Sequence, residues 1–110
     1  MPCDIDRLIR QIIEFRDKRN WAQFHNPKDL ALGLSIEASE LNELFLWKKP
    51  EDADLARVRE ELADVLIYSL LLLEKYGLDF EEIVQKKLAA NDAKYPVEKA
   101  RNSAAKYTDL

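Results

Sequence analysis

Glycine, proline and cysteine are scarce in this sequence of 110 residues, which contains two glycines, four prolines and one cysteine. So few turn-forming residues disfavour a fold of many short strands, whereas the abundant Leu, Ala, Glu and Lys favour helices. No Pro/Gly/Ser-rich linker divides the chain, and its length suits one domain. We therefore predict a single all-α domain over residues 1–110.

An excess of basic residues is also lacking, because 21 acidic residues face 17 basic ones and the formal net charge is −4. Without a basic surface, a nucleic-acid polymer is not an expected partner. The lone Cys3 cannot form an intramolecular disulfide, and the N-terminus lacks the basic start and apolar core of a secretion signal. We expect a cytoplasmic protein.

Long hydrophobic runs are absent as well. The longest apolar stretch, residues 62–73, is interrupted by Asp64 and is shorter than the roughly 20 residues that cross a bilayer. We predict a buried helix here and no membrane span. Its apolar residues point in every direction, whereas a small helical bundle covers only one side of each helix. We therefore also predict that the chain forms a homo-oligomer.

Four helices are predicted from local signals. The first begins after Asp4 and ends near Asn20, because apolar residues recur between them at the spacing of one helical face. Residues 21–26 are predicted as a loop. It ends in an Asn-Pro step, a favoured N-cap followed by proline at the first helical position, which opens a second helix to about Lys48.

The third helix is predicted over residues 54–76 and ends at Gly77, which can adopt a left-handed conformation. A capping box that begins at Asp79 opens the fourth helix, which ends before Tyr95. The polar tail, residues 97–110, has no sustained period, and we expect it to be ordered by packing on the bundle or on substrate.

Two pairs of acidic residues lie mid-helix among apolar neighbours, Glu37 with Glu40 and Glu61 with Asp64. Each pair is three residues apart and so shares one helical face. If the second and third helices form an antiparallel hairpin, four carboxylates converge, and their repulsion favours a bound cation. Oxygen ligands with no nearby cysteine select a hard ion, so we predict Mg²⁺, for which Mn²⁺ could substitute.

The spacing alone leaves alternatives open. Acidic residues three apart also occur at Glu14/Asp17, so the four carboxylates could simply line a solvated groove. A di-iron site would use Glu-x-x-His pairs, and the single histidine, His25, lies outside both helices. Iron chemistry is therefore disfavoured.

Three long stretches extend the pattern beyond the carboxylates and resemble the MazG-like all-α nucleoside triphosphate pyrophosphohydrolases, particularly their dCTP pyrophosphatase branch. They are NWAQFHNPKDLALGLSIEASELNELFLWKKP, REELADVLIYSLLLL and NDAKYPVEKARNSAAKYTDL, and together they cover nearly the whole chain. The resemblance implies a four-helix bundle in a homo-oligomer, usually a tetramer, whose neighbouring chains complete each pocket. It also implies Mg²⁺-dependent cleavage of a nucleoside triphosphate to monophosphate and pyrophosphate, which removes unwanted nucleotides.

The resemblance also implies roles for individual residues. The implied Mg²⁺ ligands and catalytic residues are Glu37, Glu40, Glu61 and Asp64, with Glu40 our candidate to accept the proton of the attacking water. The implied nucleotide-binding residues are Trp21, Phe24, His25, Trp47 and Tyr68. The implied phosphate-side residues are Lys87, Asn91 and Lys94, with Arg101 and Lys106 as weaker candidates.

Selectivity can be argued from the same side chains. Trp21 and Trp47 would pack against a pyrimidine, and Tyr68 or a tryptophan in the space of the 2′-hydroxyl would favour deoxyribose. Taken singly, each aromatic could instead be core packing, and the polar stripe could be a solvated face.

Two departures from the family pattern concern base preference and pocket closure. Vertebrate members carry a histidine where this chain has Ile12, and their connection between the second and third helices is longer than residues 48–56. Two other functions stay open at this stage: a related phosphoribosyl-ATP pyrophosphohydrolase, and a non-catalytic helical interaction module.

Overall fold

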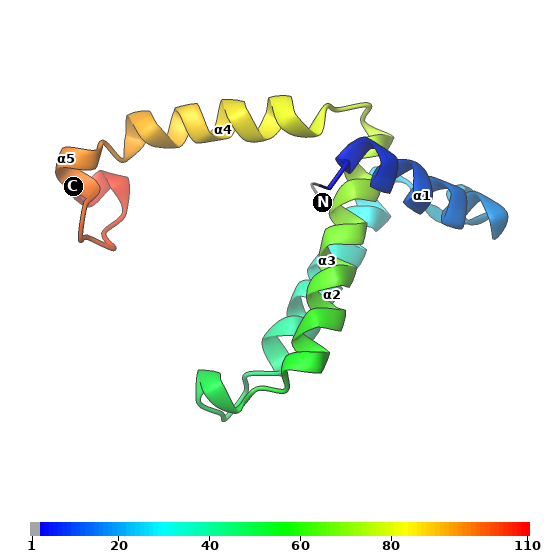
Figure 1. The fold of residues 1–110 in the computed structure, drawn as a ribbon, viewed down its shortest axis with the longest axis horizontal. Helices are drawn as coiled ribbons and strands as arrows, with labels where there is room; N and C mark the ends of the chain where they lie inside the picture. Colours follow the sequence, from blue (N-terminus) through cyan, green and yellow to red (C-terminus); the bar gives the residue numbers. More distant parts are fainter. Residues whose placement is uncertain (1–2) are drawn as a thin grey trace. The chain divides into compact units, whose positions relative to one another are not determined.

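The computed structural model describes residues 3–110, which form helices joined by turns, so the all-α class is confirmed (Figure 1). The chain divides into two compact units, one ending at Gly77 and one spanning 78–110. Helices long and apolar enough to cross a membrane are absent from the part described. The first unit contains α1 (Ile5–Lys18), η1 (Trp21–Phe24), α2 (Pro27–Glu43), η2 (Pro50–Asp52) and α3 (Leu55–Lys75).

Side-chain caps fix the starts of the three long helices of this unit. Asp4 accepts a hydrogen bond from the backbone N–H of the residue three positions on at 3.1 Å, and Asn26 does so at 2.9 Å. Asp54 accepts one from Ala56 N at 3.0 Å. These bonds satisfy N–H groups that the first helical turn leaves free, so the predicted helix starts are confirmed.

The end predicted for the second helix was too late, because α2 ends at Glu43. Beyond it, Leu44, Phe45 and Leu46 donate backbone hydrogen bonds to carbonyls three residues earlier, at 3.1–3.2 Å. These tighter turns stop at Trp47, whose positive φ of 61° is incompatible with a continuing right-handed helix.

The loop predicted at residues 21–26 is partly helical, because η1 occupies Trp21–Phe24. Asn20 ends the preceding segment with a left-handed φ of 53°, a conformation that asparagine tolerates better than most residues. Its carbonyl accepts a bond from Gln23 Nε2 at 2.9 Å, which holds the short 3₁₀ turn. The sequence pattern missed η1 because so short a turn has no hydrophobic period.

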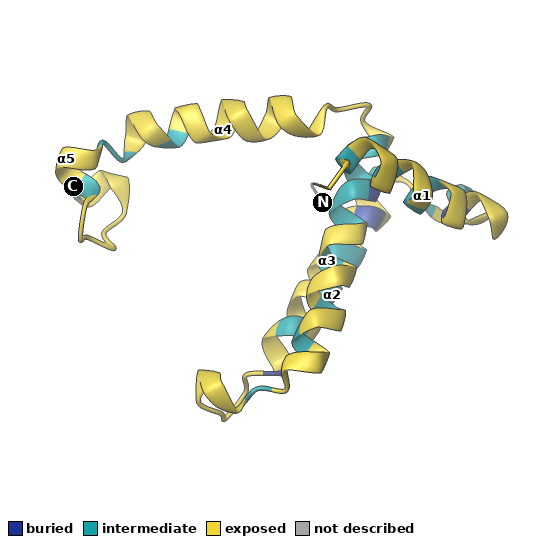
Figure 2. Ribbon diagram, viewed as in Figure 1, coloured by how far each residue is buried: buried dark blue, intermediate teal, exposed yellow. Residues whose placement is uncertain are grey.

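The core of the first unit lies where α2 and α3 pack against each other. Among the described residues, its buried apolar side chains are all leucines: Leu30, Leu44, Leu71 and Leu73. Arg16 of α1 is also buried and donates to Asp17 Oδ1 at 2.9 Å and to Glu74 Oε2 at 3.0 Å, which ties α1 to α3. Figure 2 shows how few residues of the hairpin are buried.

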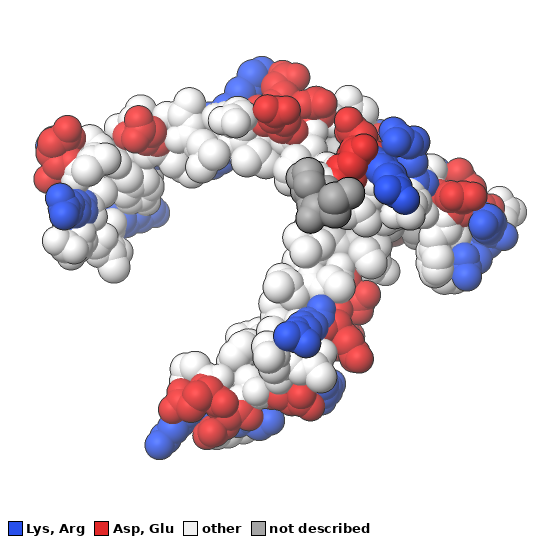
Figure 3. Space-filling view, in the orientation of Figure 1, with Lys and Arg blue, Asp and Glu red and all other residues white. Residues whose placement is uncertain are grey.

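Large apolar side chains remain exposed on both helices of the hairpin, including Leu32, Ile36 and Leu66, each at least half exposed. Along much of the α2–α3 hairpin the face seen in Figure 3 is uncharged, and charged side chains gather at its turn. A surface of this kind is typical of an interface.

The second unit contains α4 (Phe80–Lys94), α5 (Val97–Ala100) and η3 (Tyr107–Asp109). It follows Gly77, whose φ of 62° confirms the predicted left-handed end of α3. Asp79 caps α4 by accepting from Glu82 N at 2.9 Å. The tail folds back on α4, because Tyr107 packs edge-on against Tyr95 with ring centroids 5.9 Å apart.

Candidate metal centre

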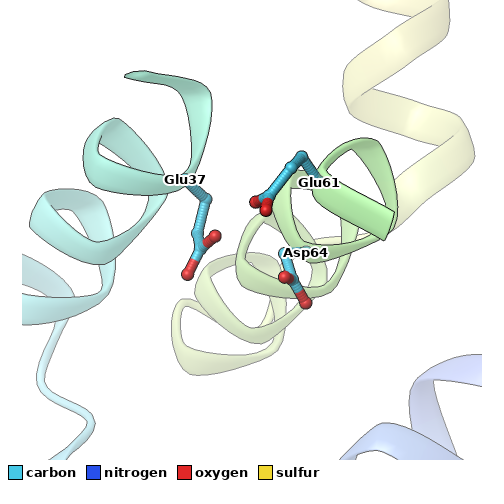
Figure 4. A group of neighbouring side chains, drawn as sticks. All are labelled: Glu37, Glu61 and Asp64. Atoms are coloured by element: carbon cyan, nitrogen blue, oxygen red, sulfur yellow. The ribbon is translucent and has the colours of Figure 1, made fainter. Parts of the chain in front are cut away.

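Three of the four predicted carboxylates converge between α2 and α3. Glu37, Glu61 and Asp64 each offer one carboxylate oxygen, and these oxygens lie within 4.8 Å of one another. Figure 4 shows Glu37 extending from α2 toward Glu61 and Asp64 on α3. Oxygens this close, drawn from two helices, can coordinate one ion together.

Glu40, the fourth predicted ligand, lies outside this group of three and is exposed. It is nevertheless close enough to affect the protonation of two of them. Burial, followed by hydrogen bonding and repulsion from Glu40, raises the pKa of Glu37 to about 7. The same causes, in the same order, raise the pKa of Glu61. Glu40 is thus at the edge of the cluster.

Two oxygens of the cluster lack a hydrogen-bond donor. Glu37 Oε2 and Glu61 Oε2 are both buried and have no hydrogen-bond partner among residues 3–110. Burying a carboxylate oxygen without a donor is costly unless a proton or a cation compensates it. Because all the available metal ligands are carboxylate oxygens, the residues fit a hard divalent cation such as Mg²⁺.

Arg57 is a charged neighbour of the cluster that the sequence pattern did not single out. It lies one turn before Glu61 on α3. Its positive charge lowers the pKa of Glu61 and so offsets part of the increase caused by burial and by the neighbouring carboxylates. The spacing of four residues would have revealed it as a neighbour on the same helical face.

Tyr68, predicted to line the pocket, lies one turn beyond Asp64 on α3 and is half-buried. Across from it on α2 is Gly33, one turn before Glu37. We call the facing sides of the two helices, formed by Gly33, Glu37, Glu61, Asp64 and Tyr68, the α2–α3 seam. The structure therefore places Tyr68 beside the carboxylates.

The predicted base-binding segment, residues 21–25, lies just before the start of α2, at the end of the hairpin opposite its turn. The ring of Trp21 meets Phe15 edge-on at 5.8 Å, and the guanidinium of Arg19 lies 3.7 Å from the centre of the Phe15 ring and 5.9 Å from that of Trp21. Trp21 stays 44 % exposed and Phe24 63 %. These side chains are thus available for stacking.

His25, next in sequence, is half-buried, and its Nδ1 is buried without a hydrogen-bond partner. Burial, and then the positive charges of Arg16 and Lys75, lower its pKa from the ordinary 6.5. The imidazole is therefore neutral at pH 7 and can donate or accept a hydrogen bond.

Trp47 is separated from this aromatic group within one chain. It follows the far end of α2, whose 17 residues span about 25 Å. Its side chain is 99 % exposed, and its positive φ is uncommon for a bulky residue. Trp21 and Trp47 of the same chain therefore cannot enclose one base.

The predicted phosphate-side stripe belongs to the second unit. Lys87, Asn91 and Lys94 follow one face of α4, with Lys87 exposed and Asn91 half-buried. The ammonium of Lys94 lies 4.9 Å above the ring of Tyr107. Arg101 and Lys106 are exposed in the tail.

Comparison with known proteins agrees with this architecture. The MazG-like family model matches residues 32–110. The chain is 42 % identical to dCTP pyrophosphatase 1 of Bos taurus, over 96 % of this chain and 68 % of that protein. It is 40 % identical to dCTP pyrophosphatase 1 of Homo sapiens, over 96 % and 67 %. The crystal structure of a pyrophosphatase from Archaeoglobus fulgidus superposes with a TM-score of 0.79 at 38 % identity, covering 87 % of this chain and 95 % of that one.

The chain therefore belongs to the MazG-like family. The expected fold type and enzyme class are confirmed at this level: the protein is an all-α nucleoside triphosphate pyrophosphohydrolase.

Proposed function

We propose that the enzyme is a Mg²⁺-dependent pyrophosphohydrolase that acts on dCTP or a related pyrimidine deoxynucleotide and removes it from the nucleotide pool. The observation that carries the proposal is the convergence of Glu37, Glu61 and Asp64, with two buried oxygens that lack a donor. The names of the mammalian relatives support the choice of dCTP.

The carboxylates of Glu37, Glu61 and Asp64 would hold the metal, with Glu40 beside them. When bound, Mg²⁺ supplies positive charge that offsets the triphosphate and the leaving pyrophosphate, and Mn²⁺ could replace it. A site of carboxylates alone repels an anionic substrate, so the cation is needed for binding as well as for chemistry.

Glu40 fits the role of proton acceptor. It is exposed at the edge of the cluster, so its carboxylate is accessible to water. In the proposed step the water oxygen bonds to the α-phosphorus while the bond from that phosphorus to the bridging oxygen breaks. Glu40 takes the proton of the water, and pyrophosphate leaves with the electron pair of the broken bond.

The nucleoside would be held by aromatic residues and by the neutral imidazole of His25. Trp21 and Phe24 offer exposed rings for stacking, and Tyr68 borders the carboxylates where the sugar would lie. Phosphate oxygens would be bound by Lys87, Asn91 and Lys94.

A second copy of the chain completes this pocket in our proposal. If Trp21 and Trp47 enclose one base, they must come from different chains, because α2 separates them by about 25 Å within one chain. The exposed apolar residues of α2 and α3 supply the interface, and we expect a homotetramer.

A product analysis tests the proposed function. Purified protein and Mg²⁺ are incubated with one nucleotide at a time, and the products are separated by chromatography. The nucleotides are dCTP, dTTP, dATP, CTP and phosphoribosyl-ATP. We expect each nucleotide that is cleaved to give its own monophosphate and pyrophosphate, with the fastest turnover for dCTP. Diphosphate and inorganic phosphate would contradict the proposed bond cleavage, and preferred turnover of phosphoribosyl-ATP would contradict the substrate.

Oligomeric state is measured separately by light scattering, where a monomer would exclude a shared pocket. Protein that neither turns over any nucleotide nor gains thermal stability with Mg²⁺ would overturn the proposal as a whole.

A further inference from the structure

Gly33 faces the ring of Tyr68 across the α2–α3 seam. A Cβ atom placed on Gly33 would overlap Cε1 of Tyr68 and would lie 3.0 Å from both Cδ1 and Cζ. Non-bonded carbon atoms prefer separations of about 3.5–4.0 Å. Any side chain at position 33 therefore forces the Tyr68 ring to move.

The backbone gives no other reason for a glycine here. Gly33 lies inside α2, and its φ is not in the left-handed region that Gly77 occupies. Glycine in a helix interior is disfavoured relative to alanine because it has more conformational freedom to lose. The room that Gly33 leaves for Tyr68 is the physical benefit that offsets this cost.

We propose that Gly33 is a positioning residue that sets the selectivity of the site for the sugar through Tyr68. The proposal rests on the proposed function, in which the triphosphate lies at the carboxylates. The sugar is bonded to the α-phosphate, so it must lie close to them, and Tyr68 is one turn beyond Asp64. A ring seated over Gly33 fills space that a 2′-hydroxyl would need, and a displaced ring leaves that space open.

A thermal-denaturation cycle without nucleotide tests the packing. Gly33→Ala in the wild-type chain should lower Tm, because the methyl group meets the ring. In a Tyr68→Ala background the same substitution should raise Tm, because the ring is gone and alanine is the better helix former. The control is Ser35→Ala, at an exposed position of α2, which should shift Tm equally in both backgrounds. A Gly33→Ala shift of the same sign in both backgrounds would overturn the packing argument.

Steady-state kinetics test the selectivity. Gly33→Ala should reduce the ratio of kcat/KM for dCTP to kcat/KM for CTP by about tenfold or more, a size typical of small steric changes in a pocket. Tyr68→Phe keeps the ring and should keep most of the ratio. An unchanged ratio in Gly33→Ala, or a ratio lost in Tyr68→Phe, would overturn the proposal.

These outcomes distinguish a failure of the proposed function from a failure of the role proposed for Gly33. A wild-type protein that turns over no nucleotide contradicts the proposed function, while the thermal cycle still reports on Gly33 and Tyr68. A wild-type protein that turns over dCTP and CTP equally contradicts the deoxynucleotide preference and the role of Gly33, but not pyrophosphohydrolysis at the metal centre.

Discussion

The carboxylates of the α2–α3 seam and the stripe on α4 are both sets of polar residues at helical spacing, yet they differ in physical character. In the seam, side chains from two helices converge, two carboxylate oxygens are buried without donors, and burial and like charges raise pKa values. On α4, Lys87 is exposed, and the neighbouring Lys86 forms an ordinary surface pair with Glu82 at 2.9 Å. Convergence from two elements, more than spacing along one, therefore marks a candidate site.

The largest expected effect comes from breaking the seam. Glu61→Gln keeps the shape but removes a negative charge and a strong oxygen ligand, so we expect kcat/KM to fall by about 10³-fold or more. The matched control is Glu60→Gln, at the adjacent exposed position, which should keep nearly full activity. Equal activity of the two variants would contradict the metal site.

A smaller effect is expected on α4. Lys87→Ala should raise KM about tenfold with little change in kcat, because one charged contact to a phosphate is lost. Lys86→Ala, which removes only the pair with Glu82, should leave KM near the wild-type value. If both variants have the same KM, the stripe is a solvated face.

The pH dependence of stability sharpens the comparison without any substrate. The folded pKa of Glu37, about 7, is above its ordinary value of 4.5, so the folded state binds this proton more tightly than the unfolded state. This contribution to stability is present at low pH and is lost as the pH rises through about 7.

In metal-free protein, Tm should therefore decrease between about pH 5 and 8, and Glu37→Gln should make the decrease shallower. Excess Mg²⁺ should oppose it, because the ion binds the ionised carboxylates. Calorimetry over this pH range, with and without chelator, makes the measurement. A Tm that rises with pH equally in the wild-type protein and in Glu37→Gln would contradict the raised pKa.

The smallest effect is expected at the aromatic group. Arg19→Gln removes the guanidinium that lies over Phe15 and near Trp21, so the indole should become more mobile. We expect a threefold or smaller rise in KM, on the order of 0.6 kcal/mol, with altered tryptophan fluorescence anisotropy. Lys18→Gln, which removes an exposed pair with Glu14, is the control and should change neither quantity.

The local signals in the sequence predicted most helix boundaries because caps and glycine act within a few residues. Asp79 caps the helix that it was expected to cap, the helix predicted to begin at Asp54 starts there, and Gly77 has the left-handed φ that its position implied. The end of α2 was missed because Leu44–Leu46 continue the apolar pattern, while the geometry at Trp47 stops the helix.

The candidate site divides in the same way. Spacing placed Glu37 with Glu40, and Glu61 with Asp64, on common helical faces, because the helical period is fixed by backbone geometry. Spacing did not indicate that Glu40 would lie at the edge of the cluster or that Gly33 would face Tyr68. Those relations depend on the register between two helices.

The sequence by itself determined the helical class, the main caps and the acidic faces, since these follow from propensity and from interactions within one or two turns. Only the tertiary structure decided which oxygens meet and which of them are buried without donors. Burial and interhelical register arise from packing between segments that are distant along the chain. The spacing of side chains within one segment therefore does not predict them.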